Sequence, residues 1–300
     1  MKALSFDDIQ LMPRYNNITS RRDVDTSVKF GDRKLDIPVL SSNMDTITGH
    51  KMAYEMSRLG GIGVLHRFCS IEENVSMYSG LSFYSDKNNH EAVVSLGINE
   101  GIDRFKALYE VGARYFCIDV AHGHSRAVGH MISVIKNIDM NVFVIAGNVC
   151  TAEGAEYLAD KGANAIEVGM GPGSVCTTRL KTGFGIPQFT ALQECRHVNC
   201  FLIADGGIKT PGDAVKAFAA GADAIMLGGM LAGTDETPGA LINETTACKN
   251  EYGDIAYLPT GNKYKVFRGM ASKEAQDEFM GSMNDWKTSE GIEIRVAVKG

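Results

Sequence analysis

A cysteine lies inside a stretch of the chain that is rich in glycine. Residues 169–185 have the sequence GMGPGSVCTTRLKTGFG, in which Cys176 is followed by two threonines and then by Arg179. The glycines and the proline predict a long loop rather than a helix or a strand. A thiol in an accessible, polar loop ionises more readily beside a cation, and the thiolate is a nucleophile. We therefore predict that Cys176 is a reactive nucleophile; the alternative is a cysteine that packs inside the loop.

Candidate binding residues follow other short apolar segments. The pairs Gly206–Gly207 and Gly228–Gly229 let a backbone approach a phosphate closely, unless each pair only makes a tight turn. Asp205 precedes the first pair, where a carboxylate would repel a phosphate. It suits a ribose diol, since two hydroxyls can donate to one carboxylate; a turn cap is the alternative. Other segments end in polar or small residues, namely Ser42, Asn43, Asp45, His66, Arg67, Asp119, His122, His124, Gly147 and Asn148.

The segments that would position these residues recur along the chain, each followed by a polar turn and a helix-like stretch. They cover residues 37–44, 61–66, 92–97, 115–121, 142–149, 165–171, 201–207 and 224–230. Short runs that are apolar on both faces and rich in Val and Ile are typical of a parallel sheet covered by helices. Eight such units predict a (β/α)8 TIM barrel, whose active site forms in the loops after the strands. A doubly wound open sheet is the alternative, but no GxGxxG follows the first run.

The remaining segments are assigned from local patterns. Helical spacing and closing glycines predict helices over 152–162 and 211–221. We expect one domain, 1–300, in which residues 1–36 cap the barrel and residues 240–300 form a flap and hairpin. Within that last segment, residues 257–267 predict two strands around a Thr-Gly-Asn turn, and residues 271–287 predict a helix.

Composition excludes several classes of protein. The 300 residues carry a formal net charge of −6 and no long Lys/Arg run, so neither nucleic acid nor an anionic membrane is an expected partner. No stretch of about 18 uncharged apolar residues occurs, so no membrane span is expected. The N-terminus turns acidic at Asp7 and Asp8, unlike a secretory signal. The seven cysteines include no CxxC pair, and a reducing cytoplasm is the expected location.

The cysteine loop and the strand ends resemble the family of IMP dehydrogenases and GMP reductases. The segments that carry the resemblance are FDDIQLMPRY (6–15), SRRDVDTS (20–27), SSNMDT (41–46), GNV (147–149), GPGSVCTTR (171–179), ADGGI (204–208), GGMLAG (228–233) and FRGMAS (267–272). They span nearly the whole chain. The resemblance implies a purine 5′-monophosphate bound in a (β/α)8 barrel, a nicotinamide cofactor, a covalent bond from the cysteine to purine C2, and a homotetramer.

The C-terminal part bears on which of the two reactions is expected. Residues 269–290 contain no Arg-Tyr pair of the kind that activates water in the dehydrogenases, and TSEG (288–291) resembles a reductase motif. We therefore expect a GMP reductase, with NADPH as the cofactor. An IMP dehydrogenase without its regulatory module is the alternative, since SSNMDT, GGIGVLH and residues 290–300 are closer to dehydrogenases. A nucleotide sensor without turnover is a third possibility, which needs no nucleophile.

The resemblance assigns roles by position. The catalytic residues are Cys176, Thr178 as a proton relay, and Glu290, which polarises Thr178. The substrate residues are Asp205, Gly206, Gly207, Gly228, Gly229, Gly269, Met270, Ala271, Lys287, Ser289 and Gly291. The cofactor residues are Ser20, Arg21, Arg67, Asp119, Val120, Ala121, Met170, Gly171 and Trp286. A potassium ion is expected on the carbonyls of Gly171, Gly173, Cys176 and Arg179.

Overall fold

A computed structural model describes residues 2–84, 92–249, 255–281 and 288–300 of the chain. Eight parallel strands close into a barrel in the order β10-β3-β4-β5-β6-β7-β8-β9. They are β3 (Val39–Ser41), β4 (Ile62–Leu65), β5 (Val93–Leu96), β6 (Tyr115–Asp119), β7 (Phe143–Val149), β8 (Ala165–Val168), β9 (Phe201–Asp205) and β10 (Ala224–Leu227). Each lies within one of the eight predicted runs, and the predicted (β/α)8 barrel is confirmed.

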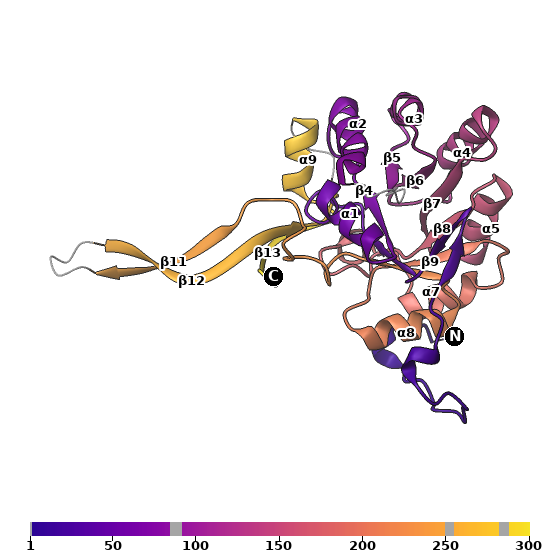
Figure 1. Cartoon of the computed structure of the whole chain (residues 1–300), viewed down its shortest axis with the longest axis horizontal. Helices are drawn as coiled ribbons and strands as arrows, with labels where there is room; N and C mark the ends of the chain where they lie inside the picture. Colours follow the sequence, from indigo (N-terminus) through magenta and orange to yellow (C-terminus); the bar gives the residue numbers. More distant parts are fainter. Residues whose placement is uncertain (1, 85–91, 250–254, 282–287) are drawn as a thin grey trace.

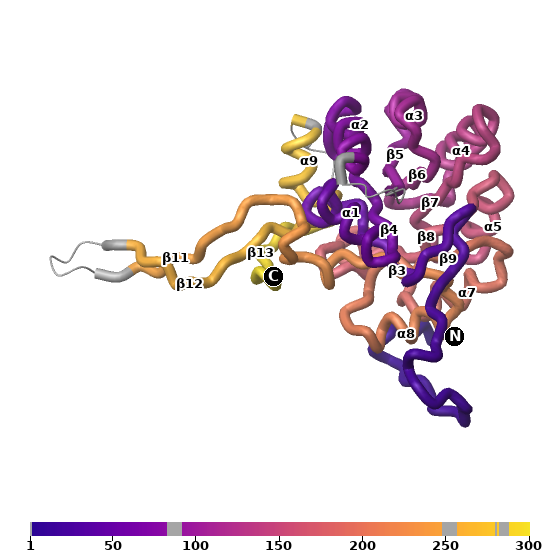
Figure 2. The backbone as a smooth tube through the Cα atoms, in the orientation of Figure 1, coloured from indigo at the N-terminus to yellow at the C-terminus, as the bar shows by residue number. Residues whose placement is uncertain are grey.

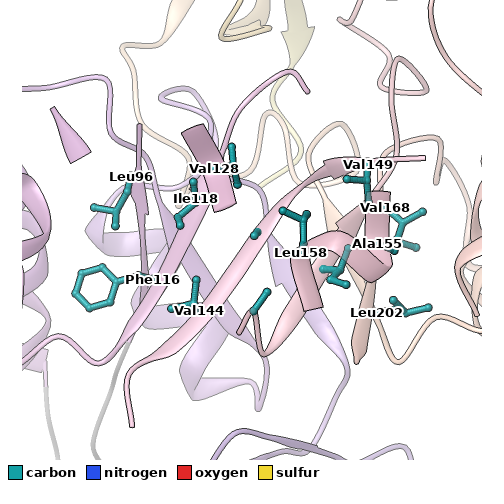
Figure 3. Close-up of a cluster of buried hydrophobic side chains, with 14 of the residues drawn as sticks. Leu96, Phe116, Ile118, Val128, Val144, Val149, Ala155, Leu158, Val168 and Leu202 are labelled. Carbon is teal, nitrogen blue, oxygen red and sulfur yellow. The ribbon is translucent and has the colours of Figure 1, made fainter. Parts of the chain in front are cut away.

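Helices cover the outside of the barrel (Figures 1 and 2). They are α1 (His50–Arg58), α2 (Ile71–Gly80), α3 (Gly101–Glu110), α4 (Arg126–Ile138), α5 (Ala152–Asp160), α7 (Gln188–Cys195) and α8 (Pro211–Ala220). Elements α5 and α8 confirm the two predicted helices. Figure 3 shows the apolar layer between helices and strands, where Val128 of α4 and Leu158 of α5 lie with strand residues such as Ile118 and Val144.

The segment before the barrel carries an antiparallel hairpin, β1 (Val28–Phe30) with β2 (Arg33–Leu35). Phe30 is fully buried, and its ring centroid lies 4.5 Å from that of Phe143 and 5.3 Å from that of Phe201. Phe143 and Phe201 are the first residues of the barrel strands β7 and β9. The hairpin therefore inserts an aromatic ring at the N-terminal end of the barrel, opposite to the end where an active site is expected.

The C-terminal segment forms a three-stranded antiparallel sheet of β11 (Ile242–Lys249), β12 (Ile255–Arg268) and β13 (Glu293–Ala297). The β11–β12 hairpin projects away from the barrel (Figure 1). The prediction of two strands around the Thr-Gly-Asn turn was wrong, because β12 runs through it. Its ladder with β11 shifts there, so residues 260–262 form a bulge, and Gly261 has the left-handed φ of +89°.

Two further short helices lie near the C-terminal end of the barrel. The predicted helix over 271–287 is present as α9 (Lys273–Met280); residues 282–287 lie outside the described residues. The glycine-rich loop was expected to hold no helix, and this was wrong over α6 (Thr178–Thr182). That turn ends at Gly183, whose φ of +77° is a common helix terminator. In the described part of the chain, no helix is long and apolar enough to cross a membrane.

Replacing Phe30 by alanine tests the contribution of the hairpin to stability. Removing a fully buried aromatic side chain is expected to cost about 3–5 kcal/mol in the free energy of unfolding. Lys34→Ala, on the exposed face of the same hairpin, is the control and should change it by no more than about 0.5 kcal/mol. Urea unfolding of both variants measures the difference, and equal stability would show that the hairpin is not part of the core.

Candidate active site

A cavity of about 1140 Å³ opens at the C-terminal ends of the barrel strands. Most residues expected to form the site line it. These are Cys176, Thr178, Glu290, Asp205, Gly206, Gly207, Gly228, Gly229, Gly269, Met270, Ala271, Arg67, Asp119, Val120, Ala121, Met170, Gly171 and Gly173. Closure of the barrel brings together segments that lie far apart in the sequence.

Some expected site residues lie elsewhere. Ser289 and Gly291 do not line the cavity; the Ser289 hydroxyl donates to the Ala271 carbonyl at 3.3 Å, just behind the wall. Ser20 and Arg21 lie at an exposed 3₁₀ turn, η2 (Arg21–Asp23), in the N-terminal segment and take no part in the cavity. Trp286 and Lys287 fall outside the described residues.

Main-chain pairing fixes the cysteine loop against the C-terminal segment. Cys176 and Gly291 form an antiparallel bridge. Next to it, the N–H of Thr177 donates to the carbonyl of Glu290 at 2.7 Å, and the N–H of Ile292 donates to the carbonyl of Val175 at 3.0 Å. These bonds place Glu290 beside the loop although the two are distant in sequence.

The same C-terminal segment is paired on its other side with residues 269–272. The N–H of Glu290 donates to the carbonyl of Ala271 at 3.0 Å, and that of Gly269 donates to the carbonyl of Ile292 at 3.0 Å. Glycine is required at this junction: a Cβ on Gly269 would lie 2.9 Å from the Val175 carbonyl oxygen, and one on Gly291 would lie 2.9 Å from the nitrogen of Ser272. The three segments therefore form one compact wall of the cavity.

An ion-pair cluster anchors this wall to the barrel. The Nε of Arg268, at the end of β12, lies 3.0 Å from the carboxylate of Asp45, which follows β3. The same guanidinium contacts Glu278 of α9 at 2.5 Å and Glu293 of β13 at 3.5 Å. Because the side chains of Arg268 and Asp45 are only 11% and 9% exposed, the pair between them resists screening by solvent better than surface pairs.

The thiol has a hydroxyl within hydrogen-bonding distance. The Cys176 Sγ lies 3.2 Å from the Thr178 Oγ1, and both side chains face the cavity that Glu290 also lines. Arg179 was expected to supply charge to the thiol, and its guanidinium does interact electrostatically with Cys176. It also donates to the carbonyls of Met170 at 3.1 Å and Ile186 at 2.5 Å, so it holds the two ends of the loop together.

Two asparagines hold the carboxylates of the cavity floor. The Asn148 amide donates to Asp205 at 2.7 Å and to the Gly169 carbonyl at 2.9 Å. The Asn43 amide donates to Asp119 at 2.8 Å. Burial raises the pKa of Asp205 to about 6, the bond from Asn148 lowers it, and the charge of Asp119 raises it. Asp205 therefore ionises near pH 6, and above that pH its carboxylate can accept hydrogen bonds from hydroxyl groups.

The sequence analysis missed an acid beneath this floor. Glu167, on β8, is 1% exposed, and the Cys117 thiol lies 3.3 Å from its carboxyl oxygen. Burial, followed by the charges of Asp119 and Asp205, raises the pKa of Glu167 well above its usual value, so its protonated form is favoured. Gly147 leaves room for it, since a Cβ there would lie 2.5 Å from the Glu167 Cβ. The sequence offered one signal for this residue, since Glu167 is the acid in the otherwise apolar run 165–171.

The two glycine pairs form turns at the cavity wall. Gly206 and Gly207 have left-handed φ angles of +83° and +79°, which other residues rarely adopt. A Cβ on Gly228 would lie 2.8 Å from the hydroxyl of Ser42. That hydroxyl is buried and has no partner among the described residues, so a polar ligand group beside the turn would satisfy it.

Other cavity residues had no role assigned from the sequence. They include Phe68, Ser174, Lys209, Gln276, Thr288 and Lys299. Gln276 comes from α9, and Phe68 packs edge-on against Phe279 of the same helix, with 5.6 Å between ring centroids. These residues lie on loops or in the C-terminal segment, where no period of hydrophobicity distinguishes them from ordinary surface positions.

The expected potassium ligands lie in the same loop. The Gly173 carbonyl accepts from Cys176 at 3.1 Å, and that of Arg179 accepts from Gly183 at 3.2 Å; a carbonyl oxygen has two lone pairs and so can accept a second contact. Within the described ranges, no group of three His, Cys, Asp or Glu side chains could hold a metal ion. A cation here would therefore depend on main-chain oxygens, as hard cations permit.

Fold and site together define a class: a (β/α)8-barrel enzyme with a thiol, a hydroxyl and a carboxylate on one wall of a cavity at the C-terminal face. The chain belongs to the family of IMP dehydrogenases and GMP reductases, which are oxidoreductases, because the family model "IMP dehydrogenase / GMP reductase domain" matches residues 3–300. The family expected from the motifs is confirmed.

Both IMP dehydrogenases and GMP reductases are similar to this chain over nearly its whole length. Inosine-5′-monophosphate dehydrogenase of Cryptosporidium parvum is 36% identical, covering 100% of this chain and 83% of its own length. GMP reductase 2 of Bos taurus is 35% identical over 99% of this chain and 83% of its own. GMP reductase of Shigella boydii is 33% identical over 99% and 84%. Sequence identity alone therefore does not distinguish a dehydrogenase from a reductase.

Asp205→Asn tests the cost of the buried charge. Folding raises the pKa of Asp205 from 3.8 to about 6. Its contribution to the stability of the fold is therefore fully present below about pH 4 and is lost as the pH rises through about 6. Near pH 7.5 the asparagine variant should be more stable, by up to about 3 kcal/mol. Thermal unfolding from about pH 4 to pH 8 measures this gain, which should vanish at the acid end.

A control with the opposite sign is available in α8. Hydrogen bonds from Lys209 and Thr210 outweigh burial and lower the pKa of Asp213, so Asp213→Asn should lose stability at neutral pH. If Asp205→Asn also loses stability near pH 7.5, Asp205 is not destabilised by burial.

Proposed function

We propose that the protein is a GMP reductase, which converts GMP, NADPH and a proton into IMP, ammonia and NADP⁺. The observation that carries the proposal is the wall in which Cys176, Thr178 and Glu290 face one cavity, joined through main-chain bonds. A nucleophile beside a hydroxyl and a carboxylate suits a reaction in which a covalent adduct loses a group that must first be protonated.

The cavity offers separate regions for each part of the nucleotide. The glycine turns at 206–207 and 228–229, together with the unpartnered Ser42 hydroxyl, suit the 5′-phosphate. Asp205, anionic above about pH 6, suits the ribose diol. Residues 269–271 then lie where main-chain groups can contact the base, beside Cys176.

The residues on the opposite side fit a nicotinamide cofactor. Val120, Ala121 and Met170 supply an apolar surface for a flat ring. The Arg67 Nε is buried without a partner among the described residues, as expected of a group that meets a cofactor phosphate. NADPH, when bound, supplies the hydride that replaces the amino group at C2.

The chain's own residues perform the remaining steps. The Cys176 thiolate adds to C2 of GMP, forming a C–S bond. Thr178, 3.2 Å from the sulfur, passes a proton that Glu290 helps to supply to the departing amino group, which leaves as ammonia with its bonding electron pair. A thioimidate remains on C2. After reduction at C2, the C–S bond breaks and the thiolate is regenerated as IMP leaves.

Further features of the proposal concern the whole molecule. We infer a single domain over 1–300, a homotetramer, a cytoplasmic location and a potassium ion on the carbonyls of residues 171, 173, 176 and 179. All described cysteines are free, which fits a reducing compartment. Ser20 and Arg21, remote from their own cavity, would then serve a neighbouring subunit's cofactor site.

An IMP dehydrogenase is the second candidate, favoured by the 36% identity to the Cryptosporidium enzyme. It would require a base that activates water. No Arg-Tyr pair occurs between residues 269 and 290, which supports the reductase.

Cys176→Ala tests the covalent step. Purified protein is incubated with GMP and NADPH while the absorbance of the reduced cofactor is followed. The variant should lose activity by about 10³-fold or more, because the adduct cannot form, yet still bind GMP. Cys150→Ala, a partly buried cysteine outside the cavity, is the matched control. Normal rates in Cys176→Ala would exclude the thioimidate, and production of reduced cofactor from IMP and NAD⁺ would identify a dehydrogenase.

Glu290→Gln tests the proton relay. The side chain keeps its shape but cannot donate or accept the proton, so kcat should fall by about 10²–10⁴-fold with a nearly unchanged KM for GMP. Steady-state kinetics measure this, with Glu274→Gln, at an exposed position of α9 outside the cavity, as the control. An unchanged kcat would assign the proton transfer to another group.

A further inference from the structure

Lys299 is a cavity residue that the proposed mechanism leaves without a role. Its side chain reaches the glycine turn after β10, where Nζ donates to the carbonyls of Gly229 at 3.2 Å and Met230 at 3.0 Å. Its own N–H donates to the carbonyl of Gly233 at 2.9 Å. The backbones are closely packed here, because a Cβ on Gly233 would lie 2.4 Å from the Ala297 carbonyl. The position of Lys299 relative to the turn is therefore fixed at both ends of the residue.

The electrostatics of this turn call for a cation. Main-chain N–H groups of a turn attract a phosphate, but the carbonyls in the same turn and the carboxylate of Asp205 repel it. Lys299 binds two of these carbonyls and places a positive charge beside the turn.

The other cavity cations are engaged differently. Lys209 forms an ion pair with Asp7 at 3.2 Å. Arg67 lies over the ring of Phe68, 4.8 Å from its centroid, among the residues assigned to the cofactor. Among the described cavity residues, Lys299 is thus the cation beside the glycine turns that makes no ion pair.

A second observation points to an anionic or polar ligand at this place. The Ser42 hydroxyl is buried in a side chain that is 6% exposed, has no described partner, and faces Gly228. A ligand oxygen next to Gly228 would satisfy it, and that oxygen would lie on the turn that Lys299 holds.

We propose that Lys299 determines specificity for the 5′-phosphate: it holds the turn at Gly229 and Met230 and neutralises the phosphate dianion of the bound nucleotide. The inference rests on the proposed function, in that it takes a purine 5′-monophosphate as the ligand. It concerns binding rather than chemistry, since the side chain of Lys299 bonds to the turn assigned to the phosphate and to none of Cys176, Thr178 and Glu290 among the described residues.

The test compares Lys299→Met and Lys299→Arg with the wild-type protein. Calorimetry measures the Kd for IMP at low and high salt, and kinetics measure KM and kcat for GMP. Because a hydrogen bond to a charged group contributes about 1.5–3 kcal/mol, Lys299→Met should weaken IMP binding and raise KM by about 10–100-fold, with kcat nearly unchanged. Lys299→Arg should restore most of the affinity, since it keeps the charge.

The salt dependence separates an electrostatic role from a structural one. Salt screens charge–charge attraction, so rising ionic strength should weaken IMP binding to the wild type more than to Lys299→Met. Lys34→Met, on the exposed strand β2 at the other end of the barrel, makes the same change in net charge and should behave as wild type. Thermal unfolding checks that each variant folds.

Different results would contradict the role of Lys299 and the proposed function. An IMP affinity within about threefold of wild type in Lys299→Met, or a loss with wild-type salt dependence, would overturn the phosphate role and leave Lys299 as a tether between the turn after β10 and the segment after β13. Wild-type protein that binds neither IMP nor GMP would overturn the proposed function, and this inference with it.

Discussion

Backbone hydrogen bonds between the cysteine loop and the C-terminal segment are the constraint on which the site depends. Cys176 sits in a loop after β8, and Glu290 follows the projecting hairpin and α9, so neither the barrel nor local structure would bring them together. The bridge from Cys176 to Gly291, with the flanking bonds from Thr177 and Ile292, does so directly. Side-chain identity matters less here than the missing side chains of Gly269 and Gly291, because three backbones meet where a Cβ would clash.

Acidic side chains lie at two depths below that wall. On the cavity floor, Asn43 and Asn148 hold the carboxylates of Asp119 and Asp205 by single amide bonds. One layer deeper, burial and the charges of these two acids raise the pKa of Glu167 and so favour its protonated form. Asp205 directly precedes the glycine turn at 206–207, so a phosphate bound there would need main-chain N–H groups and a nearby cation such as Lys299.

The barrel could be predicted because each strand is buried on both faces and stands out as a short apolar run. The residues just after those runs could then be assigned to one face, since parallel strands of a barrel all end there. The C-terminal segment gave no such periodicity. The Thr-Gly-Asn sequence that would serve as a hairpin turn became a bulge in β12, because the ladder with β11 continues on either side of it. Local turn propensity was overridden by strand pairing, which only the folded chain provides.

The sequence by itself determined the eight-unit barrel, the cysteine loop, the glycine turns and the family, because these depend on local hydrophobicity and on motifs of consecutive residues. The tertiary structure decided which side chains meet. Arg179 was expected to supply charge to the thiol, and the fold also uses it to close the loop through the carbonyls of Met170 and Ile186. Glu167 and Lys299 gained their significance only from their surroundings, a buried acid layer and a glycine turn, respectively. Contacts of this kind join residues far apart along the chain, and their distances are set by barrel closure and strand pairing rather than by any local pattern.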